Sequence, residues 1–422
     1  MNASTHDGNE LRGLGDLLTL AVGRVSAPVE GVHRALADRT LRWTGSAGAP
    51  ARRLFDTAIA GFYDAIRLTG SALGTTVGLG GNVRGSRDLF SRSPLGSRVQ
   101  AAINAAWGDE LEHRGNDLRI EMGLRNSEGS IVQLTATDLA TSFGSATPRV
   151  VVLVHGLGRT ESCWREKGSG GPAGLWDRLA ADPSVTPVMV RYNSGRHISE
   201  NGAELARLLE AMWRSWPTPI ESMALVGHSM GGLVIRSACH LGQAAQHGWI
   251  DTVDKVVTVG TPHLGAPLEK TANVVSWGLR VTPESRPLAD FLDARSVGIK
   301  DRRFGAIVEE DWLGADPDAL LHNTVGKVPL LEGADHHFVA AVITSDPAHP
   351  VGALFGDLMV RAASGTGIGR SRHIEATEIR VLGGRRHFDL PHDDEVLDQV
   401  MAWLTTSTVQ PRPGEPGEDQ ST

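Results

Sequence analysis

Residues 222–241 read SMALVGHSMGGLVIRSACHL, and this stretch decides the fold. SMALV is a short apolar run of the kind that forms a buried strand, and GGLVIRSACHL supplies a helix after it. Between them, residues 227–231 match the pattern G-x-S-x-G. A strand, this motif and a helix in succession predict a sharp turn that presents Ser229 as a nucleophile. The glycines at 227 and 231 fit this turn, because a side chain at either position would crowd it.

A serine hydroxyl is a weak nucleophile, so it needs a base to take its proton and donors where negative charge develops. Residues 149–158, RVVVLVHGLG, place a glycine-containing loop directly after a second buried strand. In a strand–elbow–helix architecture, one oxyanion donor is the N–H of the residue after the nucleophile, and the other comes from such a loop. We therefore expect Met230 and Leu157 to form an oxyanion hole. The side chain of His155 is expected only to brace the loop.

Strand-like and helix-like segments alternate along the rest of the chain. Two early runs look β-like, LRIEMGL (118–124) and IVQLTA (131–136). Further strands are expected at 185–192, 255–261, 338–344 and 378–384, and helices at 203–213, 232–241 and 394–404. Alternating β and α units predict an α/β fold, in which helices flank a mostly parallel, doubly wound sheet.

Four separated segments together resemble bacterial α/β-hydrolases of the lipase, esterase and GPI-inositol-deacylase-like branch. They read RVVVLVHGLGRTESCW (149–164), ALVGHSMGGLVIRSACH (224–240), VVTVGTPHLGAPL (256–268) and GGRRHFDLPHDDEVLDQVMAWL (383–404). The resemblance covers residues 117–405, with the motifs in the expected order. It implies the α/β-hydrolase fold and acyl chemistry on a serine, and it is not specific for a substrate.

In this fold the chain order is nucleophile, then an Asp or Glu, then the histidine base. The histidine belongs in the loop after the last strand, where His387 follows EIRVLGG and two arginines. We expect His387 to accept the Ser229 proton and return it to the leaving group. His392, beside Pro391 and close to the start of the closing helix, is the alternative base.

The acid must lie at a strand end close to the histidine, because it holds the imidazole tautomer. Asp357 lies in GDLMV (356–360), which resembles the GDxLV stretch that carries the acid in many such hydrolases. Asp346 follows the expected strand at 338–344, where topology alone would place the acid. We expect Asp357, and Asp346 is the alternative. The predicted catalytic residues are therefore Ser229, Asp357 and His387.

The chain is expected to divide into a helical N-terminal extension (1–115), an α/β-hydrolase domain (116–408) with a lid-like insertion (264–336), and a disordered tail (409–422). Apolar residues of the extension recur at helical spacing, although Pro28 and Gly31 are expected to interrupt or cap the first helix. These apolar positions are Leu18, Val22, Val25, Val29, Val32 and Leu36, and then Phe55, Ile59, Phe62 and Ile66. We expect them to pack on the rest of the protein or on a second copy in a homo-oligomer. Peripheral membrane contact through residues 1–115 is the alternative.

Composition narrows the classes of partner and the compartment. The formal net charge is −8, so no general field attracts nucleic acid. The two cysteines, Cys163 and Cys239, exclude a disulfide framework and suit a reducing compartment. The N-terminus lacks the features of a secretory signal, and no stretch is long and apolar enough to span a membrane. We expect a cytoplasmic protein, with any membrane association peripheral.

These observations predict a serine hydrolase of the esterase or lipase type, which cleaves carboxylic esters through an acyl-enzyme on Ser229. The substrate is expected to be a small-molecule or lipid-like ester, and no cofactor or metal is expected. Two alternatives use the same residues differently. One is an acyltransferase that passes the acyl group from Ser229 to an alcohol or amine. The other is a catalytically silent, lipid- or membrane-associated protein with a hydrolase fold.

Overall fold

The structure is a computed structural model of the 422-residue chain. It describes residues 10–41, 49–80, 90, 93–144, 146–166, 173–265, 296–301, 305–311, 328–369 and 372–406. Most of the expected lid-like insertion (264–336) and the whole of the expected tail (409–422) lie outside these residues. None of the described helices is long and apolar enough to cross a membrane.

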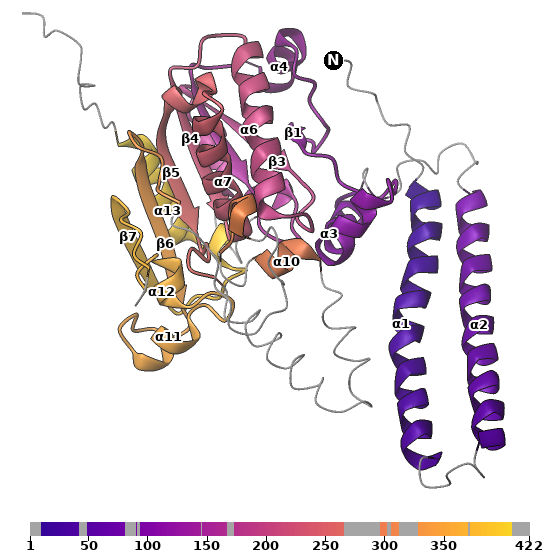
Figure 1. The fold of residues 1–422 in the computed structure, drawn as a ribbon. Helices are drawn as coiled ribbons and strands as arrows, with labels where there is room; N and C mark the ends of the chain where they lie inside the picture. The colour runs from indigo at the N-terminus through magenta and orange to yellow at the C-terminus, as the bar shows by residue number, and fades with distance from the viewer. Residues whose placement is uncertain are drawn as a thin grey trace, which may run out of the picture.

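The described strands form one sheet in the order β1-β3-β2-β4-β5-β6-β7. The edge strand β1 runs antiparallel to β3, and every other neighbouring pair is parallel. This arrangement is the α/β-hydrolase fold (Figure 1). The strands are β1 (Gly123–Arg125), β2 (Arg149–Val154), β3 (Val185–Arg191), β4 (Ser222–His228), β5 (Val253–Val259), β6 (Asp335–Val342) and β7 (Glu378–Gly383).

Helices cover both faces of the sheet. In the hydrolase region they are α4 (Ala136–Phe143), α5 (Leu175–Ala180), α6 (Ile198–Ser215), α7 (Met230–Ala244), α10 (Val297–Asp301), α11 (Pro350–Phe355), α12 (Ala362–Gly365) and α13 (Asp394–Thr405). Short 3-10 turns lie at η2 (Glu161–Trp164), η3 (Gly248–Thr252), η4 (Glu309–Asp311) and η5 (Leu390–His392).

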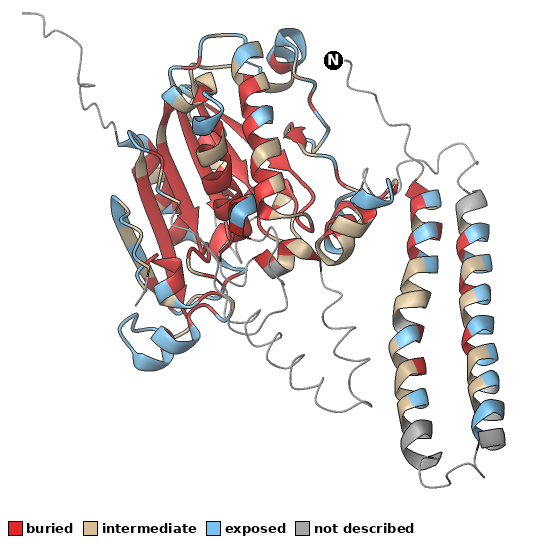
Figure 2. Ribbon diagram, viewed as in Figure 1, coloured by how far each residue is buried: buried red, intermediate tan, exposed pale blue. Residues whose placement is uncertain are grey.

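The strands read as continuous apolar runs because both of their faces are buried. Along β4, Met223 and Leu225 pack in the core that includes α6 and α7. Ala224 and Val226 point the opposite way, into the core that includes α5 and α13. Figure 2 shows the resulting buried interior of the sheet in red. The periodicity of two along a strand therefore divides one apolar run between two cores.

The prediction of β-structure at residues 131–136 is wrong. Only an isolated bridge joins Ile131 to Arg125, and α4 begins at Ala136. Thr135 caps this helix, since its side chain accepts a hydrogen bond from the backbone N–H of Asp138. A capping threonine with an aspartate three residues later favours a helix start over further strand.

The last strand before the acid also differs from expectation, because β6 begins at Asp335, inside the expected insertion. His336 and His337 of this strand are only 5% and 6% exposed. Their places in the sheet follow from register, as His336 pairs with Val256 and His337 with Val257.

The N-terminal extension contains α1 (Glu10–Leu41), α2 (Ala49–Gly80) and α3 (Pro94–His113). The first two form a long hairpin that stands away from the sheet (Figure 1). The helices approach closely, because a Cβ at Gly70 would lie 2.6 Å from Val22 Cγ1. Contrary to expectation, Pro28 lies inside α1 without ending it. The loss of one helical hydrogen bond is tolerated where a helix packs along a neighbour over most of its length.

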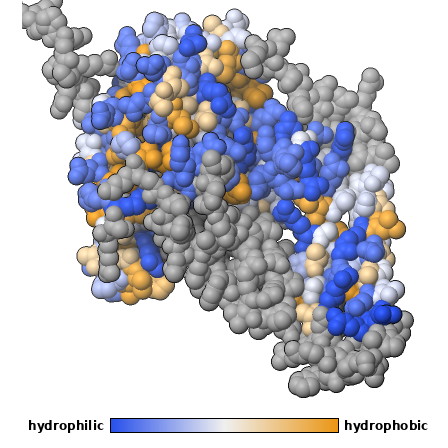
Figure 3. All heavy atoms as spheres, viewed as in Figure 1, coloured by the Kyte–Doolittle hydropathy of each residue, from blue (hydrophilic) through white to orange (hydrophobic). Residues whose placement is uncertain are grey.

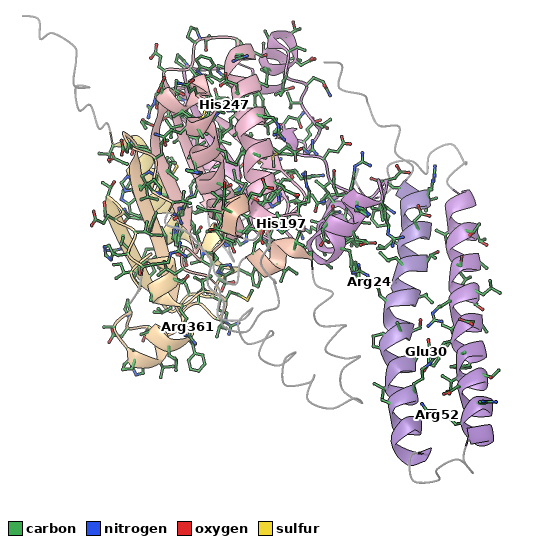
Figure 4. The ribbon with its side chains drawn as sticks, viewed as in Figure 1. Arg24, Glu30, Arg52, His197, His247 and Arg361 are labelled. Carbon is green, nitrogen blue, oxygen red and sulfur yellow. The ribbon has the colours of Figure 1, made fainter. Side chains whose placement is uncertain are left out.

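Charged and aromatic side chains show which face of the hairpin is inside. In Figure 4, Glu30 points from α1 toward α2, where it pairs with Arg67. Tyr63 is 3% exposed, whereas the adjacent Phe62 is 59% exposed. Of the expected stripe, Ile59 and Ile66 are half-buried, whereas Phe62 is exposed and Tyr63 takes the inner position in its place. Figure 3 shows the exposed apolar residues of the hairpin in orange.

Helix α3 joins the extension to the hydrolase region. Asn104 is fully buried, and its Nδ2 donates to the carbonyl of Leu118 at 2.8 Å. Its Oδ1 accepts the N–H of Ile120 at 2.9 Å. On the other side, Arg24 of α1 pairs with Glu110 of α3 at 3.4 Å. The boundary expected at residue 115 thus falls between groups that hydrogen-bond to each other.

Candidate active site

Ser229 lies at the turn between β4 and α7. Its φ of 52° and ψ of −121° are strained for a residue with a side chain. The turn is tight enough to require the glycines around it. A Cβ at Gly227 would lie 2.6 Å from Gly232 N, and one at Gly231 would lie 2.3 Å from Val154 O. The backbone N–H of Ser229 donates to Val259 O at 2.8 Å, which ties the turn to β5.

Three predicted side chains meet at this turn. Ser229 Oγ lies 2.8 Å from His387 Nε2, and His387 Nδ1 lies 2.7 Å from Asp357 Oδ2. An ionised carboxylate only accepts hydrogen bonds, so Nδ1 carries the ring proton and Nε2 accepts from the serine hydroxyl. All three residues are buried, with exposed fractions of 3%, 2% and 1% in the order Ser229, His387, Asp357. Water is therefore largely excluded from the hydrogen-bonded row of Ser229, His387 and Asp357.

Asp357 is held by the turn that contains it. Its Oδ1 accepts the backbone N–H groups of Met359 at 2.9 Å and Val360 at 2.7 Å. Its own carbonyl accepts the N–H of His387 at 3.0 Å. The next residue, Leu358, has a φ of 80°, a left-handed conformation that is strained for leucine. One carboxylate oxygen is thus fixed by the backbone, and the other is directed at the imidazole.

The structure does not bring the two alternative residues to Ser229. Asp346 is exposed, and its Oδ1 accepts the N–H of Ala348 at 2.9 Å in a local turn. His392 Nε2 lies 3.0 Å from Arg159 Nη2 and 3.3 Å from Glu166 Oε2. Both alternatives therefore have other partners.

The two expected oxyanion donors belong to segments that adjoin the nucleophile. Met230 is the first residue of α7, where N–H groups lack acceptors within the helix. The loop that contains Leu157 packs closely against the turn between β4 and α7, since a Cβ at Gly156 would lie 3.1 Å from Ser229 Cβ. Within the part of the chain that the structure describes, neither N–H donates a hydrogen bond.

His155 braces this loop, as expected. Its Nδ1 donates to the carbonyl of Gly156 at 2.9 Å, and its Nε2 accepts the N–H of Tyr192 at 3.3 Å. The Tyr192 ring stacks on the imidazole with centroids 4.4 Å apart. Complete burial lowers the pKa of His155 to about 4, so the ring is neutral near pH 7.

Sequence reasoning missed two residues that support the site. His228 is buried, and its Nε2 lies 3.3 Å from the carbonyl of His387, which helps to hold the base. Burial lowers the pKa of His228 well below its ordinary value, so this ring adds no charge beside His387. Ser194 Oγ accepts the N–H of Gly158 at 3.0 Å. Only the position of His228 directly before Ser229 could have indicated its role, and Ser194 left no signal.

A cavity of about 820 Å³ opens at the opposite end of the sheet. Its lining includes Ser222, Val253 and Asp335, the first residues of β4, β5 and β6. Ser229 follows the last residue of β4, a seven-residue strand of about 23 Å at ~3.3 Å per residue. Ligands of open α/β sheets bind beyond the carboxyl ends of the strands. We therefore assign the reaction site to the Ser229 end rather than to this cavity.

Comparison with known proteins agrees with the fold. The model of the PGAP1-like alpha/beta domain family matches residues 195–314, which include the elbow. No curated protein matches the chain.

Solved structures similar to the chain include two lipases and an esterase. The mature lipase BlEst2 of Bacillus licheniformis has a TM-score of 0.42 and 20% identity, over 68% of this chain and 98% of that one. The lipase of Staphylococcus hyicus has a TM-score of 0.35 and 15% identity, over 61% and 95%. The hyperthermophilic esterase of Pyrobaculum calidifontis has a TM-score of 0.34 and 15% identity, over 62% and 76%. Since these scores are low, the assignment of the fold rests on the strand order and the strand–Ser229–helix turn.

Proposed function

We propose that this chain, a member of the α/β-hydrolase superfamily, is a serine hydrolase that cleaves carboxylic esters through an acyl-enzyme on Ser229. The observation that carries the proposal is the hydrogen-bonded row from the Ser229 hydroxyl through His387 to Asp357. A nucleophile, a base and an acid that orients the base are the parts that acyl transfer requires. The burial of all three residues and the strained backbone at Ser229 support a reactive site over a structural cluster.

In the proposed reaction, His387 Nε2 takes the Ser229 proton while Oγ attacks the ester carbonyl carbon. Asp357 stabilises the imidazolium that forms, and it remains ionised. The carbonyl oxygen becomes an oxyanion, which accepts hydrogen bonds from the N–H groups of Leu157 and Met230. Each such donor typically contributes about 3 kcal/mol of transition-state stabilisation.

The tetrahedral intermediate collapses when His387 donates its proton to the leaving alcohol, which leaves an acyl group on Ser229 Oγ. A water molecule then attacks the acyl carbon, and His387 takes the water proton. The second collapse releases the carboxylic acid and returns the proton to Ser229. Both half-reactions use the same donors and the same base, so the residues of this chain suffice for them.

A fluorophosphonate probe tests the nucleophile directly, because it forms a covalent bond with activated serines. We expect wild-type protein to be labelled and Ser229→Ala to remain unlabelled. On a panel of p-nitrophenyl esters of increasing acyl length, Ser229→Ala should lose kcat by on the order of 10⁶-fold. Equal hydrolysis by Ser229→Ala and wild type would refute the proposal. A folded wild-type protein that neither reacts with the probe nor turns over any ester would do so too.

A further inference from the structure

The loop that carries the Leu157 N–H is held from two sides. The N–H of Gly158, at a φ of 66°, donates to Ser194 Oγ at 3.0 Å. The N–H of Arg159 closes a turn onto the carbonyl of Gly156 at 3.2 Å. The side chain of Arg159 then leaves the loop on the side of η5 and enters a charged cluster. The proposed reaction assigns no role to this cluster.

The cluster consists of Arg98, Arg159, Glu166 and His392, and we call it the loop clamp. Arg159 Nη2 lies 3.0 Å from Glu166 Oε2 and 3.0 Å from His392 Nε2. Glu166 also accepts a hydrogen bond from Arg98 Nη2 at 2.7 Å. The side chains of Arg159, Glu166 and His392 are 26%, 28% and 16% exposed. Residues 156–159, which include the Leu157 N–H, are called the oxyanion loop. The guanidinium of Arg159 in this loop therefore contacts two other segments of the chain.

The protonation state of His392 favours this geometry. An arginine only donates, so the 3.0 Å contact from Arg159 Nη2 is a hydrogen bond when the ring is neutral and His392 Nε2 carries no proton. The same Nε2 lies 3.3 Å from Glu166 Oε2. Burial lowers the pKa of His392, against the opposing effect of Glu166, and Arg159 lowers it further. Asp389 also faces the ring electrostatically. The lowered pKa favours the neutral ring, which can accept a hydrogen bond from the guanidinium.

Helix α3 adds support from the N-terminal region. Arg98, which binds Glu166, lies in its first turns. A Cβ at Gly158 would lie 3.4 Å from Ala105 Cβ, so α3 is in contact range of the loop. The carbonyl of Gly108 accepts Asn193 Nδ2 at 2.9 Å, next to the Ser194 that binds Gly158. Helix α3 therefore contacts Gly158 of the loop and two residues beside the groups that hold it, Glu166 and Asn193.

We infer that Arg159 is a positioning residue, which Glu166 and His392 hold so that the Leu157 N–H keeps its direction toward the oxyanion. The inference rests on the proposed function, because it assigns a role in that reaction. It also gives a role to His392, the alternative base, which lies close to His387 in the sequence but contacts Arg159 rather than Ser229. Oxyanion donors act only within a narrow range of distance, so a displaced loop slows acylation without weakening ground-state binding.

The test is steady-state hydrolysis of p-nitrophenyl esters by the full chain and its variants. Arg159→Met keeps most of the side-chain volume and removes every donor. We expect its kcat to fall by about 10- to 100-fold, as for other small misplacements of reacting groups, with KM changed by less than about threefold. His392→Gln retains an acceptor oxygen and should stay closer to wild type than His392→Leu, which has none.

Arg178→Met is the matched control. Arg178 is also a partly buried guanidinium, and it joins α5 to α13 through Asp394 and Asp398 at 2.5 Å each. It lies outside the oxyanion loop, so kcat should not change. A second readout is binding of a boronic acid, whose tetrahedral adduct on serine places an oxygen at the oxyanion position. Arg159→Met should weaken this binding by the same factor as kcat.

The outcomes separate the inference from the proposed function. A wild-type protein that fails to react with a fluorophosphonate overturns both. An active wild type with kcat of Arg159→Met within about twofold overturns the clamp alone. An equal loss in Arg178→Met would also overturn it, because general destabilisation would then explain the effect.

Discussion

The Ser229 end of the sheet and the α1–α2 hairpin bury their side chains in different ways. At the sheet end, polar groups are buried and bonded to one another, as in the row of Ser229, His387 and Asp357. In the hairpin, the side chains between α1 and α2 are buried, and those on the outer face are exposed to solvent. Phe62, Leu68 and Leu73 are 59%, 74% and 60% exposed there.

This difference predicts how each region responds to substitution. A buried polar group that loses its partner keeps the cost of desolvation, so one change at the sheet end affects its neighbours. A side chain on the outer face of the hairpin has few contacts to lose. The sheet end should therefore tolerate few changes, and the hairpin many.

Asp357→Asn should produce the largest effect in this comparison. The asparagine oxygen can still accept the N–H groups of Met359 and Val360, but its amide would present a donor to His387 Nδ1. The imidazole then takes the other tautomer, and Nε2 can no longer accept the Ser229 proton. We expect kcat for ester hydrolysis to fall by about 10⁴-fold. Asp346→Asn is the control and should retain full activity; the reverse pattern would show that Asp346 is the acid.

Two glycine substitutions compare the regions by stability. In Gly231→Ala the added Cβ would lie 2.3 Å from Val154 O, and we expect the protein to lose about 1–3 kcal/mol of unfolding free energy. In Gly61→Ala the Cβ would meet nothing within 4 Å inside α2, and alanine favours the helix by about 0.5–1 kcal/mol. Urea unfolding followed by circular dichroism measures both. Opposite signs are expected, and equal signs would contradict the comparison.

The smallest effect is expected for Phe62→Ser. Because this side chain is exposed on α2, the unfolding free energy should change by no more than about 0.5 kcal/mol. Gel filtration and vesicle flotation of the same variant test the two partners considered for the extension. Loss of self-association would indicate that a second copy covers this face, and loss of vesicle binding would indicate lipid. A large loss of stability would show that Phe62 is buried after all.

Local sequence patterns were sufficient to predict those parts of the fold that depend on one short segment alone. The buried strands β2, β4 and β5 follow from continuous apolar runs, and the elbow follows from a strand, G-x-S-x-G and a helix in succession. The same reasoning was wrong at 131–136, where a capping threonine starts α4. It also selected Phe62 over Tyr63 as the inner residue, since apolar spacing alone does not say which face of α2 meets α1.

By itself, the sequence determined the class of fold, the position of Ser229 and the short sets of acids and bases worth weighing. Only the tertiary structure decided which of them stand together, because the reach of a side chain depends on loops that the chain order does not describe. His387 and His392 are five residues apart, yet one contacts Ser229 and the other contacts Arg159. The strained turn at Leu358 directs Asp357 at the imidazole, and such a turn is set by the packing around it rather than by the preference of leucine.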